Sequence, residues 1–218
     1  MTTQTFGNKT ASTVLIQPVD PHGLAAAERE TEQIKAATGK DICLIATVVD
    51  EWNRDLAPWT APAVFGNEPF GDGAKYTLEF ILGLCRDEDR DYYLGGYSLA
   101  GLFSLWAAYE TDVFSGIAAA SPSVWYPKFT DHIRNRSIQT EAVYLSMGDG
   151  ESRSKNTTLA TVSDRIKETY DIIMDQNIKC TLEWNPGNHF KDPDIRCANA
   201  FIWLNKERPF QCVTHQHK

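Results

Sequence analysis

The stretch Gly95-Gly96-Tyr97-Ser98-Leu99-Ala100-Gly101 decides the fold class, because of what lies on either side of it. A strand is predicted over Asp91–Tyr97, and residues 99–109 (LAGLFSLWAAY) are apolar nearly all round, which is typical of a buried helix. A serine on a tight turn from strand to helix has the form of a nucleophile elbow. The alternative is a glycine-rich packing turn in which Ser98 has no chemical role.

Small residues two before and two after the serine favour the elbow. Gly96 and Ala100 let the strand and the helix approach closely around a strained backbone. The helix N-terminus would also place the N–H of Leu99 where negative charge develops on a carbonyl oxygen under attack. We therefore expect Ser98 to be a nucleophile and Leu99 to donate to the oxyanion.

Strand and helix patterns alternate along the rest of the chain, and residues 50–73 and 121–137 are expected to be irregular. Further strands are predicted at Thr13–Val19, 41–49, Phe114–Ala120, 141–147 and 178–184. Further helices are predicted at 25–38, ending at Gly39, and at 74–84, 157–174 and 195–204. This alternation predicts an α/β fold, with a mostly parallel sheet of about six strands flanked by helices, in one domain over residues 1–218.

A serine nucleophile needs a base, and five histidines are available. His189 lies in NPGNHF, five residues after a predicted strand that ends at Trp184, where a turn could direct its ring over the sheet edge. We expect His189 to be the base, the alternative being a surface or capping histidine. The other histidines fit less well by chain order or by their place in a polar tail: His22, His132, His215 and His217.

Two carboxylates, Asp149 and Glu151, follow the strand predicted over 141–147. Either could be only a solvated turn residue or a helix-capping partner. We favour Glu151 as the acid that orients His189, because it lies further from the strand end and has the longer side chain. Asp149, or a serine–histidine pair without an acid, remains the alternative.

Four motifs, GGYSLAG, ASPSVWY, GDGE and GNHF, together resemble an esterase family of the α/β-hydrolases that includes esterase D-like enzymes and siderophore-ester hydrolases. The resemblance is most specific over residues 91–125 and 144–190. It implies an α/β-hydrolase fold with Ser98 as nucleophile, Glu151 as acid and His189 as base. It also implies that the stretch from Ser121 to Trp125 lines the acyl side of the site.

The chain departs from the larger members of that family at its front. Only about a dozen residues precede Val14, so we expect the leading antiparallel strands to be absent and the sheet to be truncated at this edge. No HGGG-type loop is present either. By position, the second oxyanion donor should come from the turn around Val19 and Asp20.

The loop over 50–73 and the motif ASPSVWY supply candidate substrate contacts. Trp52, Arg54 and Trp59 could form a wall near the nucleophile, and Trp125 could line the pocket. The alternative is structural: the tryptophans pin the loop to the core and Arg54 pairs with Asp55.

Composition excludes several other classes of protein. The net charge of −8 and the pI near 5.1 give no basic surface for nucleic acid or an anionic membrane, and no apolar run approaches a membrane span. The polar residues 1–12 do not read as a secretory signal, so we expect a cytoplasmic protein.

The cysteines point to the same compartment and to no cofactor. Cys43, Cys85, Cys180, Cys197 and Cys212 form no Cys-x-x-Cys pair and are expected to be reduced. The histidines and cysteines show no metal-ligand spacing either. We therefore expect neither a metal nor an organic cofactor.

These patterns predict hydrolysis of a small-molecule carboxylic ester through an acyl-enzyme. Ser98 would attack the carbonyl, His189 would transfer the proton and Glu151 would orient His189. A thioesterase or an acyltransferase with the same residues, or a catalytically silent binding protein with the same fold, is the alternative.

Overall fold

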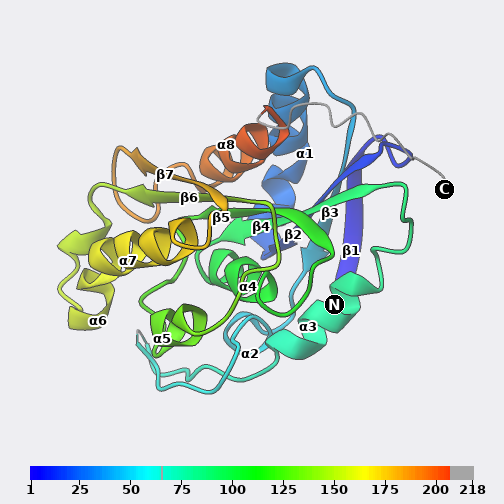
Figure 1. Ribbon diagram of the computed structural model, residues 1–218. Helices are drawn as coiled ribbons and strands as arrows, with labels where there is room; N and C mark the ends of the chain where they lie inside the picture. The colour runs from blue at the N-terminus through cyan, green and yellow to red at the C-terminus, as the bar shows by residue number, and fades with distance from the viewer. Residues whose placement is uncertain (65, 207–218) are drawn as a thin grey trace.

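The computed structural model describes residues 1–64 and 66–206, and these build a seven-stranded sheet in the order β1-β3-β2-β4-β5-β6-β7 (Figure 1). Its strands are β1 (Thr2–Gly7), β2 (Thr13–Val19), β3 (Ile42–Val48), β4 (Asp91–Tyr97), β5 (Phe114–Ala120), β6 (Ala142–Gly148) and β7 (Lys179–Asn185). All neighbours are parallel except β1, which runs antiparallel to β3. The predicted mostly parallel sheet is confirmed. Cys212, His215 and His217 lie outside the described residues.

Strand β1 corrects the expectation that the leading antiparallel strands are absent. Its residues, TTQTFG, pair with β3 from Thr2↔Val48 to Gly7↔Cys43. The sequence carries no apolar alternation here, because an edge strand with few buried side chains does not need one. One antiparallel strand therefore closes this edge.

Helices cover both faces of the sheet, as predicted. Helices α1 (Pro21–Thr38) and α8 (Pro193–Lys206) pack together on one face (Figure 1). The other face carries α2 (Trp52–Asp55), α3 (Ala74–Leu82), α4 (Leu99–Ala107), α5 (Phe129–Arg134), α6 (Thr157–Ala160) and α7 (Val162–Met174). Side chains alternate along each strand, so β2 sends Leu15 to the α1–α8 core and Ile16 to the α4 core.

Three segments differ from the secondary structure predicted for them: two loops contain short helices, and one helix is split in two. The loop over 50–73 contains α2 and a bridge between Ala61 and Phe70. The segment over 121–137 contains α5, which is only six residues long and follows Lys128 in the left-handed conformation (φ 66°). The helix expected over 157–174 is divided at Thr161 into α6 and α7.

The sheet opens between β2 and β4 at the carboxyl ends of these strands. Ladder pairing with β3 runs the full length of β2, whereas pairing with β4 stops at Ile16↔Leu94. The peptide groups of Val19 face β3, since its carbonyl accepts from the N–H of Val49 at 3.1 Å, so those of Pro18 face β4. Proline has no N–H, and the ladder to β4 cannot continue past it.

No helix among the described residues has both the length and the apolar character that a membrane crossing requires. Cys43, Cys85, Cys180 and Cys197 are free thiols.

Glu30 is a buried carboxyl group on the inner face of α1, with only 2% of its surface exposed. Burial, helped by the nearby Asp194 carboxylate, raises the pKa of Glu30 to about 8 against the smaller lowering effects of Gln17 and Arg29. Oε2 of Glu30 and Oε1 of Gln17 have no hydrogen-bond partner within the described residues. The charged form of Glu30 is therefore disfavoured in the folded protein.

We predict that Glu30→Gln stabilises the protein increasingly as pH rises. A carboxyl group whose pKa is raised by folding contributes stability below the unfolded pKa and loses it as pH rises through the folded pKa. Glutamine removes this loss and can donate to Gln17. The gain in free energy of unfolding should be small at pH 5 and on the order of 3 kcal/mol at pH 8, measured by urea denaturation.

Glu28→Gln is the matched control, because Glu28 lies on the exposed face of the same helix. It should change stability by less than about 0.5 kcal/mol at both pH values. A Glu30→Gln gain that does not grow between pH 5 and pH 8 would contradict the prediction.

Candidate active site

Ser98 occupies a strained turn between β4 and α4. Its backbone has φ 58° and ψ −118°, a conformation that residues other than glycine rarely adopt. A Cβ on Gly96 would lie 2.6 Å from the Cβ of Ala100, so only glycine fits there. The carbonyl of Ser98 accepts from the N–H of Leu102 and from that of Ser123, both at 3.0 Å. The structure thus contains the strand–turn–helix geometry that the sequence predicted.

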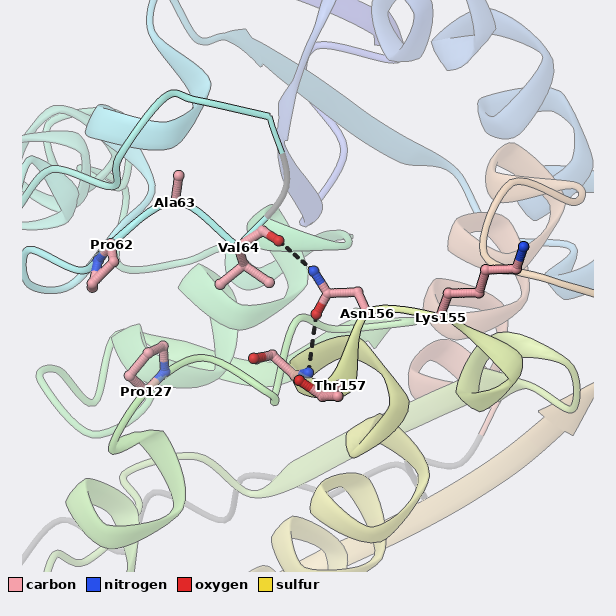
Figure 2. Close-up of a pocket in the computed structure, with 8 residues that line it drawn as sticks. Pro62, Ala63, Val64, Pro127, Lys155, Asn156 and Thr157 are labelled. Atoms are coloured by element: carbon pink, nitrogen blue, oxygen red, sulfur yellow. Dashed lines mark hydrogen bonds between the residues drawn. The ribbon is translucent and has the colours of Figure 1, made fainter.

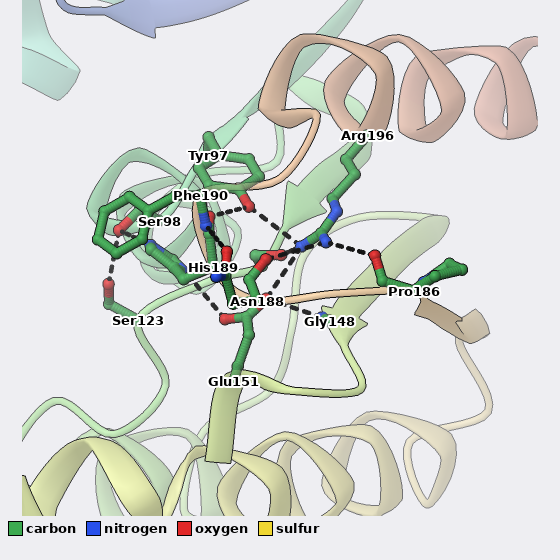
Figure 3. Close-up of polar contacts among 11 residues, drawn as sticks. Tyr97, Ser98, Ser123, Gly148, Glu151, Pro186, Asn188, His189, Phe190 and Arg196 are labelled. Atoms are coloured by element: carbon green, nitrogen blue, oxygen red, sulfur yellow. Dashed lines mark hydrogen bonds and ion pairs between the residues drawn. The ribbon is translucent and has the colours of Figure 1, made fainter. Parts of the chain in front are cut away.

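His189 reaches Ser98 from the loop between β7 and α8 (Figure 3). Its Nε2 lies 3.0 Å from Oγ of Ser98, and its Nδ1 lies 2.7 Å from Oε2 of Glu151. Tyr97 supports the loop, because its hydroxyl donates to the carbonyl of His189 at 2.6 Å and the two rings pack 5.2 Å apart. The three residues predicted to act together form one continuous hydrogen-bonded chain.

Glu151 begins a short 3₁₀ helix, η1 (Glu151–Arg153), after β6, and its side chain is almost fully buried. Its Oε1 accepts from the N–H of Gly148 at 2.7 Å and from Nη1 of Arg196 at 3.0 Å. Burial acts to raise the pKa of Glu151. Contacts with His189, Gly148 and the Ser121 hydroxyl outweigh burial, and the pKa is lowered. The carboxyl group is therefore held as an anion.

Asp149 lies two residues away but does not contact the ring of His189. Its Oδ1 accepts from the N–H of Gly187 at 2.9 Å, and its own N–H donates to the carbonyl of Asn185 at 2.8 Å. The N–H of Gly150 bonds to the carbonyl of Gly187 at 2.9 Å as well. Asp149 thus fastens the histidine loop to the end of β6, while Glu151 faces His189.

Two serines after β5 complete the surroundings of Ser98. Oγ of Ser123 lies 3.3 Å from Oγ of Ser98. Ser121 is buried with a positive φ of 42°, and its hydroxyl accepts from Nη1 of Arg196 at 2.9 Å. The stretch that the resemblance assigned to the acyl side therefore touches Ser98 through Ser123.

Of the two backbone N–H groups expected to bind the oxyanion, one is suitably placed and the other is not. Leu99 is the first residue of α4, so its N–H has no acceptor within its own helix and is free to bind an oxyanion. Val19 is wrong as the second donor, because its peptide groups face β3 and not β4. By the alternation along the extended backbone, the N–H of Asp20 is the next one that faces β4.

The loop residues expected at the substrate wall are engaged in structural contacts. Trp59 packs against Tyr126 and His132, and its Nε1 donates to the carbonyl of Pro127 at 3.0 Å. Arg54 pairs with Glu51 and Asp55, as the structural alternative anticipated. Within the described residues, no hydrogen bond or ring contact joins either of them to Ser98 or His189.

The remaining two tryptophans also pack against the core on the α4 side. Trp52 is partly buried there. Trp125 is 9% exposed, with its ring centroid 6.0 Å from that of Phe70 and 6.2 Å from that of Tyr126. Only a small part of Trp125 is therefore open to a ligand.

A hollow of about 520 Å³ lies between the loop over 50–73 and the start of α6 (Figure 2). Asn156 ties its two sides together, because Nδ2 donates to the carbonyl of Val64 at 2.5 Å and Oδ1 accepts from the N–H of Thr158 at 3.0 Å. The hollow is lined by residues 62–64 and 155–158 together with Pro127, and not by Ser98, Glu151 or His189.

Two residues at the site were not predicted from the sequence. Arg196 is the one charged residue on the buried, mostly apolar face of α8, and a charge in that position was the available signal. Phe190 follows the histidine, is 86% exposed and meets the His189 ring edge to face at 5.6 Å. An exposed aromatic ring beside the serine–histidine pair is a candidate contact for an apolar part of a ligand.

The described part of the chain holds no group of three or more histidine, cysteine, aspartate or glutamate side chains arranged to hold a metal ion. The groups at the site lie in series: the Ser98 hydroxyl, the His189 imidazole and the Glu151 carboxylate. The arrangement can carry out proton transfer and nucleophilic attack by the serine hydroxyl.

Comparison with solved structures places this geometry in a known fold. An IroE-like serine hydrolase from Shewanella oneidensis is 14% identical with a TM-score of 0.71, over 90% of this chain and 71% of that one. The siderophore hydrolase EstB from Aspergillus nidulans is 17% identical with a TM-score of 0.71, over 95% and 90%. The enterobactin esterase FES from Shigella flexneri is 14% identical with a TM-score of 0.63, over 93% and 53%.

These likenesses show that the chain has the α/β-hydrolase fold, which confirms the fold that the resemblance implied. No protein-family model and no curated protein matches the sequence.

We predict that Ser98→Gly is more stable than Ser98→Ala. Both variants lose the hydroxyl, but only glycine relaxes the backbone at φ 58°, where an L-residue costs about 1–3 kcal/mol. The greater freedom of glycine in the unfolded chain offsets up to about 1 kcal/mol of this. Ser98→Gly should therefore unfold a few degrees higher than Ser98→Ala in thermal melts. Equal melting temperatures would mean that the turn stores no strain.

Proposed function

We propose that this protein is a serine hydrolase that cleaves a carboxylic ester of a small molecule through an acyl-enzyme intermediate. The observation that carries the proposal is the continuous chain from Oγ of Ser98 through the His189 ring to Oε2 of Glu151, with joints of 3.0 and 2.7 Å. This hydrogen-bonded series starts at a serine on a strained elbow, which presents the hydroxyl at the carboxyl ends of the strands.

The reaction begins with transfer of the Ser98 proton to Nε2 of His189 as Oγ attacks the ester carbonyl. Glu151 accepts the Nδ1–H, which leaves Nε2 unprotonated and directed at the serine, and it stabilises the imidazolium that forms. His189 then gives the proton to the leaving alcohol oxygen, and the acyl group stays on Ser98. A water molecule, deprotonated by His189, releases the carboxylic acid and restores Ser98.

The oxyanion of each tetrahedral intermediate is held by backbone donors. We assign one to the N–H of Leu99 at the start of α4, where the helix dipole also favours negative charge. We assign the second to the N–H of Asp20, because the ladder between β2 and β4 ends before it and leaves this side of the turn unpaired.

The solved structures of similar fold support an ester as the substrate class. Those named for an activity include siderophore hydrolases and an enterobactin esterase. Siderophore esters are therefore the first substrates to test, beside simple nitrophenyl esters. A thioesterase or an acyltransferase would use the same residues. Comparing ester with thioester substrates tests the first, and transfer of the acyl group to an added alcohol in place of water tests the second.

Aromatic side chains supply the apolar contacts in this proposal. Phe190, largely exposed beside His189, binds the alcohol or acyl group directly, and Trp125 closes the acyl side behind Ser123. Trp52, Arg54 and Trp59 shape the wall by holding the loop over 50–73 in place. The free cysteines fit a reducing compartment, and we propose a cytoplasmic location.

We predict that Ser98→Ala abolishes both ester hydrolysis and labelling by a fluorophosphonate probe. Loss of the nucleophile should lower kcat by several orders of magnitude, as removal of a triad serine does elsewhere. Ser123→Ala is the matched control, because it removes a hydroxyl 3.3 Å away and should still be labelled. A folded wild-type protein that takes no label would favour the silent binding protein instead.

We predict further that Glu151→Gln costs far more activity than Asp149→Asn. The first change removes the negative charge beside His189, and kcat should fall by about 10²- to 10⁴-fold. The second weakens a bond to a backbone N–H, and kcat should stay within about ten-fold of wild type. The two variants are compared in the same assay. A crippled Asp149→Asn beside a near-normal Glu151→Gln would exchange their roles.

A further inference from the structure

We propose that Arg196 is a positioning residue, which fixes both the acid and the histidine loop in the geometry that the reaction needs. The inference rests on the proposed function for its catalytic meaning. Its observations are the contacts of one buried guanidinium with the elements around the site (Figure 3).

Arg196 is 2% exposed, on the face of α8 that packs against the sheet. Removing an arginine from water costs several kcal/mol unless charge and hydrogen bonds compensate. A hydrophobic residue would serve packing better at this position, since the neighbouring buried residues of α8 are Cys197, Ala198 and Ala200. The charge is therefore explained by its partners.

One side of the guanidinium faces the acid. Nη1 lies 3.0 Å from Oε1 of Glu151 and 2.9 Å from Oγ of Ser121. The N–H of Gly148 binds the same carboxylate oxygen. With Oε1 held by two donors, the carboxylate cannot rotate, and Oε2 alone is directed at Nδ1 of His189.

The other side faces the histidine loop. Nη2 donates to the carbonyl of Asn188 at 3.1 Å and to that of Pro186 at 3.5 Å. Nη1 also donates to the hydroxyl of Tyr97 at 3.1 Å, and that hydroxyl donates to the carbonyl of His189. The carbonyl groups of Pro186 and Asn188, and that of His189 through the Tyr97 hydroxyl, are thus tied to one side chain, which sets the height of the ring over Ser98.

The charges around His189 give the proposal a second consequence. Glu151 from η1 is the anion in contact with the ring, and Arg196 from α8 neutralises it. Tyr97 from β4 stays neutral, because burial raises its pKa to about 12. The charged groups of the loop lie elsewhere: Asp149 binds the backbone N–H of Gly187, and Lys191 packs beside that glycine. Removal of the Arg196 charge leaves the Glu151 charge unbalanced, which favours the imidazolium.

The test compares Arg196→Met with Arg196→Lys. In Arg196→Met, kcat/KM should fall by about 10²-fold or more, mainly through kcat, and the acidic limb of its pH profile should move up by roughly one pH unit. Lysine restores the charge but not the fork of donors, so the limb should return while kcat recovers only in part. A pH profile that keeps its shape in Arg196→Met would overturn the proposal.

Arg29→Met and Tyr97→Phe separate positioning from a general effect on folding. Arg29 is exposed and pairs with Asp194 at the start of α8, so its loss should leave rate and profile unchanged. Tyr97→Phe removes only the relay to the His189 carbonyl and should lower kcat by about three- to ten-fold with no shift of the limb. If Arg196→Met does not fold, Arg196→Lys and Tyr97→Phe carry the test, and full activity in both would overturn the proposal.

A spectroscopic arm needs no turnover. The Nδ1–H of His189, bonded to Glu151 at 2.7 Å, should give a far-downfield proton NMR signal in wild type and in Arg29→Met. It should be lost or broadened in Arg196→Met. A protein that takes no fluorophosphonate label but shows this dependence fails the proposed function and keeps the Arg196 inference. A labelled protein whose signal survives Arg196→Met fails the inference alone.

Discussion

The carboxyl edge of this sheet is organised around the need of one buried carboxylate, that of Glu151, for hydrogen-bond donors. A carboxylate removed from water is stable only when donors replace its hydration. Here the donors come from four separate segments: the N–H of Gly148 at the end of β6, the Ser121 hydroxyl after β5, the His189 ring and the Arg196 guanidinium. Satisfying the carboxylate therefore aligns the ends of three strands and the start of α8.

The backbone of Ser98 is also strained, and contacts in the same region supply the free energy that maintains this conformation. The positive φ is maintained because Gly96 and Ala100 bring β4 and α4 into contact, and because Leu102 and Ser123 bind the Ser98 carbonyl. On the other side of the elbow, the hydrogen-bond ladder between β2 and β4 ends before Pro18, which has no N–H. The elbow is therefore held rigidly on the β5 side, while on the β2 side ladder pairing has already stopped at Ile16↔Leu94.

Sequence reasoning succeeded where a signal is local. The elbow, the strand–helix alternation and the turn before His189 are each contained in a short segment, and the structure has all three. It failed where pairing is distant or depends on direction. Strand β1 forms because it pairs with β3. Val19 is unsuitable as a donor because its N–H and carbonyl groups face β3. Arg196 contacts partners up to 99 residues away in the sequence. None of these leaves a periodic pattern in the sequence.

The turn after β6 shows how two similar carboxylates come to have different surroundings. Asp149 directly follows the strand, and its short side chain reaches the N–H of Gly187 on the outer side. Glu151 follows two residues later, after the chain has turned into η1, and its longer side chain points inward beneath His189. A Cβ on Gly148 would lie 2.5 Å from the Gly187 carbonyl and 2.9 Å from Oε1 of Glu151, so glycine is required where both contacts meet. Close approach of two loops, more than the identity of either acid, thus determines which carboxylate lies against the His189 ring.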